Sequence, residues 1–190
     1  YNDDIIYFSR DGEGCRVEIE TGRATRFAKH SSNRVLGGDL KNNFLYVYKS
    51  LALEVLIYDL NNNNQLHNTC AIGGGSDLGM ALAGIQNFEH SSLKIDKSSS
   101  YLFTMYSDPF DASQTIIEKF PLTGGLGSCP SLTASSSTRL IKDMRSTRDI
   151  EIHPTKDDTF LITRLDRIYE WDASANTWGT GGEAGIGGFR

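Results

Sequence analysis

The sequence predicts an all-β fold, and three observations agree on it. Short runs rich in β-branched and aromatic residues recur along all 190 residues, and polar turns separate them. Similar runs return at intervals of roughly 40–60 residues, with about four strands in each unit. Helical periodicity is almost absent from the sequence. A repeat of this length and strand content predicts a β-propeller, with four blades in this chain.

Each unit contains an apolar strand, and these strands can be overlaid. They are IIYF at 5–8, FLYV at 44–47, YLFT at 101–104 and FLIT at 160–163. A second strand follows in each unit and ends in a polar turn, at 19–22, 58–61, 120–124 and 171–174. The last three units also begin with a shorter strand, which carries Asp39, Lys94 or Glu151.

The overlay divides a single domain, residues 1–190, into four blades and a closing strand. We predict the blades at approximately 1–30, 31–71, 90–133 and 147–180. The first unit lacks the innermost strand, and residues 185–190 can supply it. We therefore expect Ile186 to Phe189 to pair with Ile5 to Phe8, because ring closure removes exposed sheet edges. Part of a larger propeller and a two-sheet β-sandwich are the alternatives.

Three segments resemble the blades of known propeller families. LKIDKSSSYLFTMYSD (93–108) and IEIHPTKDDTFLITRLDRIYEWD (150–172) resemble the strand, turn, strand, strand pattern of WD40-like and YVTN-like blades. RIYEWDASANTW (167–178) resembles the end of a kelch-like blade. The resemblance covers nearly the whole chain at the level of pattern. It implies a propeller, and its YVTN-like part permits a lactonase-like, metal-dependent hydrolase.

The glycine-rich stretch IGGGSDLGMALAG (72–84) invites a nucleotide-binding interpretation but does not support one. A phosphate-binding loop needs a lysine and a hydroxyl after its last glycine, and Met80 and Ala81 follow Gly79 instead. Loops of this length are uncommon in compact domains unless they are functional. We therefore predict a protein-contact loop at Gly73, Gly74, Gly75, Ser76, Asp77 and Leu78.

Three charged residues occupy matching positions on the predicted innermost strands. These are Asp39, Lys94 and Glu151, with Arg148 and Asp149 nearby. In a propeller the innermost strands line the central channel, so these five residues are the candidate ligand site for a small molecule or an ion. The alternative is a purely structural network in which the charges pair with one another.

No motif predicts a catalytic, metal or cofactor site. The four histidines lack metal-ligand spacing, and no G-x-S-x-G motif is present. The cysteines Cys15, Cys70 and Cys129 form no CxxC pair. We expect buried or inert thiols, with at least one that is free or bonded to another chain.

Composition limits the partners. The net charge is −5 and the Lys and Arg residues are scattered, so we expect no nucleic-acid partner. No apolar run approaches the roughly 20 residues that cross a bilayer, so we expect no membrane insertion within this span.

The leading hypothesis is a non-catalytic propeller that binds a protein or assembles with itself, as a subunit or ectodomain of a larger assembly. An extracellular or cell-surface location is slightly favoured over others. The alternatives are a propeller enzyme of the lactonase or hydrolase type, and a glycan-binding propeller that stacks sugars on Trp171 or Trp178.

Overall fold

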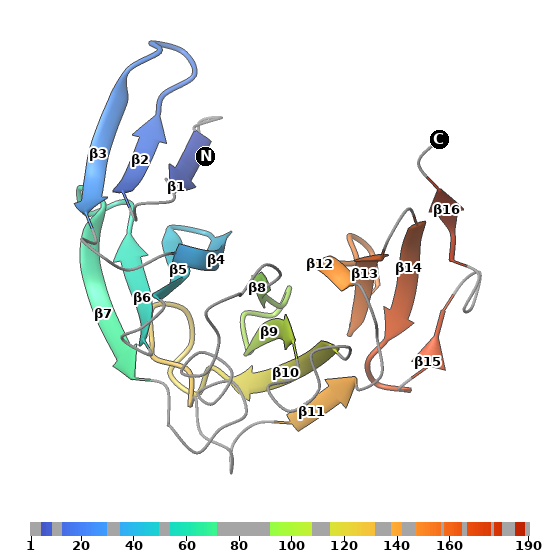
Figure 1. The fold of residues 1–190 in the computed structure, drawn as a ribbon. Helices are drawn as coiled ribbons and strands as arrows, with labels where there is room; N and C mark the ends of the chain where they lie inside the picture. The colour runs from blue at the N-terminus through green and yellow to red at the C-terminus, as the bar shows by residue number, and fades with distance from the viewer. Residues whose placement is uncertain are drawn as a thin grey trace.

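In a computed structural model, the chain forms four antiparallel β-sheets (Figure 1). Strands that follow one another in the sequence are neighbours within each sheet, except that β16 pairs with β14 and not with β15. Every regular element in the described part of the chain is a strand. The structure describes residues 5–8, 13–29, 35–49, 54–71, 92–107, 115–131, 138–141, 147–156, 158–164, 167–175, 177–179 and 185–188.

The sheets follow one another along the chain. The first sheet contains β1 (Ile5–Phe8), β2 (Glu13–Val17) and β3 (Ala24–Lys29). The second contains β4 (Val35–Lys41), β5 (Phe44–Lys49), β6 (Glu54–Asp59) and β7 (Gln65–Ala71). The third contains β8 (Ser92–Ile95), β9 (Tyr101–Ser107), β10 (Thr115–Pro121) and β11 (Thr138–Ile141). The fourth contains β12 (Thr147–Ile152), β13 (Thr159–Arg164), β14 (Arg167–Asp172) and β15 (Thr177–Trp178), and β16 (Gly187–Gly188) also pairs with β14.

The sheets are arranged along an open arc (Figure 1). Strands β4, β8 and β12 lie along the inside of the arc, and β7, β11 and β15 lie along its outside. The apolar strands predicted from the overlay lie within β1, β5, β9 and β13, and the predicted shorter strands lie within β4, β8 and β12. A stack of four separate sheets differs from a two-sheet sandwich, so that alternative is wrong.

Local sequence explains the tight turns. Asn42 has a φ of 50° between β4 and β5, and Asn63 and Asn64 have φ values of 53° and 56° between β6 and β7. Asparagine tolerates this left-handed conformation better than other non-glycine residues. The turn predicted at Asn61 to Asn64 is confirmed, and it reverses the chain into β7.

The apolar core lies between consecutive sheets, because the central strands are buried on both faces. Val55 and Ile57 of β6 pack against the third sheet, whereas Leu56 and Tyr58 of the same strand pack towards the first. On β9, alternate side chains likewise contribute to two different clusters. The third and fourth sheets share the cluster of Phe103, Met105, Ile117, Ile150, Phe160, Ile162, Tyr169 and Trp171.

A loop of the third sheet is fastened to the second sheet. The Tyr46 hydroxyl accepts a hydrogen bond from Gly127 N (2.7 Å) and donates one to Ser128 O (3.3 Å). Asn68 Nδ2 donates to Gly127 O (2.7 Å). Gly127 has a φ of 83°, and a Cβ there would lie 2.8 Å from the Phe44 ring, so this close approach requires glycine.

A disulfide between Cys70 and Cys129 completes this attachment, with a sequence separation of 59 residues. The expectation of buried or inert thiols is therefore wrong for these two cysteines. Cys15 is free, which is one of the two outcomes that the odd number of cysteines allows. The bond was not predictable from spacing, because it depends on the loop that brings Cys129 beside the end of β7.

The predicted closing strand is wrong. Gly187 and Gly188 of β16 pair with Ile168 and Arg167 of β14, whereas β1 pairs with β2. Figure 1 shows β1 and β16 at opposite ends of the arc, and no sheet of the described residues joins them. The closed four-blade ring is therefore not observed.

The edge of β14 explains this pairing. Strand β15 is two residues long and pairs only with Trp171 and Asp172, so the first half of β14 keeps a free edge. Ile186 N donates to Ile168 O (2.8 Å), which satisfies a backbone acceptor on that edge. A nearby edge costs less loop-closure entropy than β1 at the far end of the chain.

We predict that Cys70→Ser or Cys129→Ser lowers the free energy of unfolding by about 3–4 kcal/mol, because the bond closes a long loop in the unfolded chain. Urea unfolding under non-reducing conditions measures the change. Cys15→Ser is the control, and it should shift stability by no more than about 0.5 kcal/mol. Equal effects of all three substitutions would contradict the assigned pairing.

Candidate functional site

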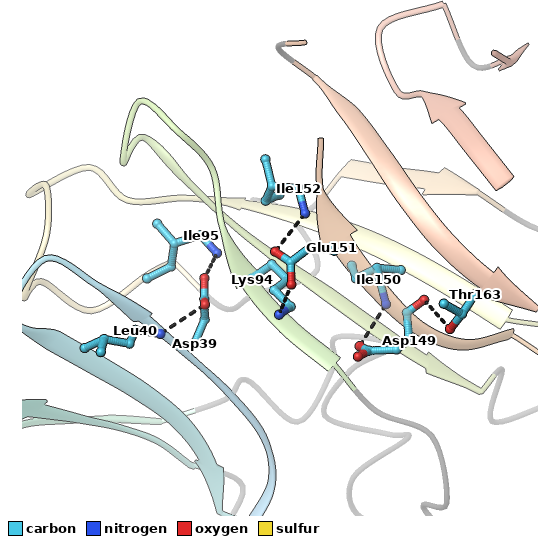
Figure 2. A network of polar contacts seen from close by, with 9 residues as sticks. All are labelled: Asp39, Leu40, Lys94, Ile95, Asp149, Ile150, Glu151, Ile152 and Thr163. Carbon is cyan, nitrogen blue, oxygen red and sulfur yellow. Dashed lines mark hydrogen bonds and ion pairs between the residues drawn. The ribbon is translucent and has the colours of Figure 1, made fainter. Parts of the chain in front are cut away.

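The inside of the arc brings the predicted charged residues of three sheets together (Figure 2). Asp39 extends from β4 of the second sheet to the third sheet. Its Oδ2 accepts a hydrogen bond from Ile95 N (2.7 Å), and its Oδ1 accepts one from Leu40 N (3.0 Å). One carboxylate therefore links the backbones of two neighbouring inner strands.

The third and fourth sheets are linked by an ion pair. Lys94 Nζ lies 2.7 Å from Glu151 Oε2, and Glu151 Oε1 accepts a hydrogen bond from Ile152 N (3.1 Å). The Lys94 side chain is 15% exposed and that of Glu151 is 61% exposed. Because water screens such a pair, we expect it to contribute no more than about 1 kcal/mol to stability. The pair spans the two inner strands β8 and β12.

Burial and neighbouring charges shift the pKa values of this site. Burial raises the pKa of Asp39 above 3.8, and the Ile95 hydrogen bond and the Lys94 charge oppose this without cancelling it. Burial alone would lower the pKa of Lys94. The hydrogen bond and charge of Glu151, together with the charges of Asp39 and Asp149, outweigh burial and raise that pKa.

The other two candidate residues lie on β12 beside this pair. Asp149 Oδ1 accepts a hydrogen bond from Ile150 N (2.8 Å), and Thr163 Oγ1 donates to Asp149 O (3.3 Å). The Arg148 side chain lies outside the described residues, so its predicted place in the site stays a prediction. The structure thus brings Asp39, Lys94 and Glu151 together across three sheets, with Asp149 close enough to influence Lys94 electrostatically.

This geometry suits a structural network better than general acid–base chemistry. The Asp39 carboxylate accepts two backbone N–H groups, and the Lys94 and Glu151 charges face each other (Figure 2). Among the described residues, no three His, Cys, Asp or Glu side chains converge as metal ligands would. The hydrolase alternative stays a prediction.

Sugar stacking needs an exposed tryptophan ring, and the two tryptophans of this chain are buried or half-buried. Trp171 is 8% exposed and belongs to the cluster between the third and fourth sheets. Trp178 is half-buried and packs edge-on against Trp171, with ring centroids 4.8 Å apart. Both rings pack in or against the core. The exposed tryptophan on which the glycan-binding alternative depends is therefore not observed.

The predicted contact loop, Gly73 to Leu78, lies outside the described residues and stays a prediction.

The sequence did not predict a cavity of about 560 Å³, which lies at one end of the interface between the third and fourth sheets. No local motif marks it, because its walls come from separate strand ends. The lining residues are Asp96, Lys97, Ser98, Tyr101, Phe103, Lys119, Ile152, Asp158, Thr159 and Phe160.

Comparison with known proteins supports the fold. No family model matches the chain, and no curated protein matches its sequence. A chain in the crystal structure of the mitotic checkpoint complex is similar to it, with a TM-score of 0.51 and 12% sequence identity. The match covers 92% of this chain and 61% of that chain. At this identity the likeness concerns the fold alone, which is β-propeller-like.

The described secondary structure was also compared with what a membrane-spanning helix requires. Within the described ranges, the chain has no helix that is both long and apolar enough to cross a bilayer. The expectation that nucleic acid is not a partner stays a prediction.

We predict that the Asp39 pKa responds to its two charged neighbours in opposite directions. Lys94→Met should raise it further, because the lysine charge stabilises the carboxylate, and Glu151→Gln should lower it, because a negative charge is removed. Carboxyl ¹³C NMR titration measures both shifts. An unchanged Asp39 pKa in both variants would show that the three side chains do not interact.

The same shifts have a defined effect on stability. Since folding raises the Asp39 pKa, its contribution to the free energy of unfolding falls as pH rises from about 4 through the folded pKa. The raised Lys94 pKa stabilises the fold below about pH 10.5, and that contribution is lost above it.

Proposed function

We propose that this chain is a non-catalytic, propeller-like module that binds another protein. The proposal rests on one observation, which is that the charged side chains on the inside of the arc bind protein groups of neighbouring sheets. Asp39 and the Lys94–Glu151 pair join neighbouring sheets, so the polar groups on the inside of the arc serve the scaffold. Such a scaffold leaves loops and strand ends as the surfaces for recognition.

The structural likeness supports the same function. The similar chain is part of the mitotic checkpoint complex, and the match covers 61% of that similar chain. In the described residues, the first and fourth sheets each pack against one neighbouring sheet only. We therefore favour the alternative in which these four sheets are part of a larger propeller ring, completed by further sheets beyond those described.

The disulfide supports an oxidising location for the module. Disulfides persist outside the cell and are rare in reducing compartments. The Cys70–Cys129 bond joins two sheets, so it forms part of the fold. Together with the sequence-based expectation, it favours an extracellular or cell-surface module.

The long connection between β7 and β8 is the proposed contact loop. We expect that deleting residues 73–84 abolishes retention of a protein partner while leaving the fold intact, because the deletion removes the loop and leaves the sheets in place. Affinity capture from an extract of the source cells, compared by quantitative mass spectrometry, measures retention.

A matched control replaces residues 73–84 with a Gly/Ser segment of equal length, which tests whether the side chains matter. Circular dichroism and thermal unfolding confirm that each variant is folded. Proteins retained equally by the wild type and by both folded variants would remove this loop from the binding surface.

A further inference from the structure

The first sheet has an unpaired edge on the inside of the arc. It contains three strands, whereas each of the other sheets contains at least four. Strand β1 pairs with β2 on one side and with no strand of the described residues on the other. Figure 1 shows β1 as the strand of this sheet nearest the inside of the arc. Alternate residues of β1 therefore direct backbone N–H and C=O groups towards that edge.

The other three sheets have an inner strand at this place. Strands β4, β8 and β12 each pair with the strand that follows, which is β5, β9 or β13. The sequence overlay matches β1 with these following strands, because all four carry the apolar run of their unit. The described part of the first sheet therefore lacks the strand that corresponds to β4, β8 and β12.

A leucine of β4 is exposed where such a strand would lie. Leu40 pairs with Leu45 of β5, and directly paired residues of an antiparallel sheet point to the same face. Leu45 packs in the core between the first and second sheets and is 5% exposed. Leu40 faces the same way, yet it is 38% exposed.

The matching residues of the next two inner strands are covered. Ile95 and Ile152 directly follow the matched charges of β8 and β12, as Leu40 follows that of β4. Ile95 is 2% exposed in the core between the second and third sheets, and Ile152 packs against the core between the third and fourth. Strand β8 lies beside β4, and β12 lies beside β8. Strand β4 has no preceding inner strand among the described residues, so the exposure of Leu40 marks the place of one.

The described strands of this chain do not fill the edge. Strand β16 belongs to the segment predicted for it, and Gly187 and Gly188 pair with β14 instead. Every other described strand lies in a sheet through its own neighbours. We therefore assign the added strand to a partner protein.

We infer that the inner edge of β1 binds one extended segment of the partner protein as an added β-strand. Backbone hydrogen bonds to β1 hold the segment, and one of its aliphatic side chains covers Leu40. Strand addition at a sheet edge is a recurring mode of recognition, in which main-chain bonds provide affinity and alternate side chains provide specificity. This inference rests on the proposed function, because it names how the module holds part of its partner.

The test uses a probe peptide copied from residues 92–97, acetyl-Ser-Leu-Lys-Ile-Asp-Lys-amide, which includes the inner strand β8. It is titrated into the ¹⁵N-labelled chain and followed by ¹H–¹⁵N NMR and amide hydrogen exchange. We expect amide shifts at residues 5–8 and 39–41, and slower exchange of alternate amides within 5–8. A control peptide with proline at the Leu and Lys positions should bind at least about tenfold more weakly, because it loses backbone donors on both edges.

Variants of Leu40 test the side-chain contact. Leu40→Ser should weaken the probe peptide at least about threefold, because an aliphatic contact is lost. Leu66→Ser is the matched control, since Leu66 is a leucine of the outer strand β7 that is 51% exposed. It should bind the probe peptide as the wild type does. Circular dichroism confirms that both variants are folded.

Several results would overturn the inference. These are equal binding of the probe and proline peptides, equal weakening by both leucine variants, shifts confined to other residues, or no shifts at millimolar peptide. Slow exchange of all amides of residues 5–8 before the peptide is added would also overturn it, because the edge would then already be paired.

Failure of the peptide test is distinguishable from failure of the proposed function. Loss of protein capture in the 73–84 deletion would still support protein binding if the probe peptide did not bind. Binding of the probe peptide to residues 5–8, with capture unchanged in the deletion, would instead support the strand site and remove the loop.

Discussion

The structure depends on one constraint, which is that its central sheets are apolar on both faces. On β6, Val55 and Ile57 face one neighbour while Leu56 and Tyr58 face the other, and all four are buried. A sheet of this kind is stable only when another sheet covers each face, because both sets of side chains must leave water. Face-to-face stacking of consecutive sheets follows directly, and the arc is the result of repeating it.

Polar contacts then fix how each pair of neighbouring sheets lies. Inside the arc, Asp39 reaches the Ile95 backbone and Lys94 pairs with Glu151. Farther out, Tyr46 and Asn68 bind the Gly127 backbone beside the disulfide of the same loop. These links hold the edges of interfaces whose centres are apolar. A cavity lined in part by Lys119 remains at one end of the interface between the third and fourth sheets.

The strands and the matching inner charges were predictable because they follow from local patterns. Short runs of β-branched and aromatic residues locate β5, β9 and β13, and the overlay places Asp39, Lys94 and Glu151 on equivalent strands. The closing strand was mispredicted because the sequence does not reveal which edge is free. The edge of β14 is free there because β15 is only two residues long. The disulfide and the cavity were missed because each joins segments far apart in the sequence through tertiary packing.

Face-to-face packing of the sheets in sequence order, with β1 and β16 in different sheets, underlies the other features of the described structure. Methyl and amide NOE measurements on the ¹³C,¹⁵N-labelled chain test it most directly. We predict NOEs between Ile57 and Leu93, between Met105 and Ile162, and between Gly187 and Ile168. NOEs from Gly187 or Gly188 to residues 5–8, with none to Ile168, would contradict this arrangement and restore the closed ring.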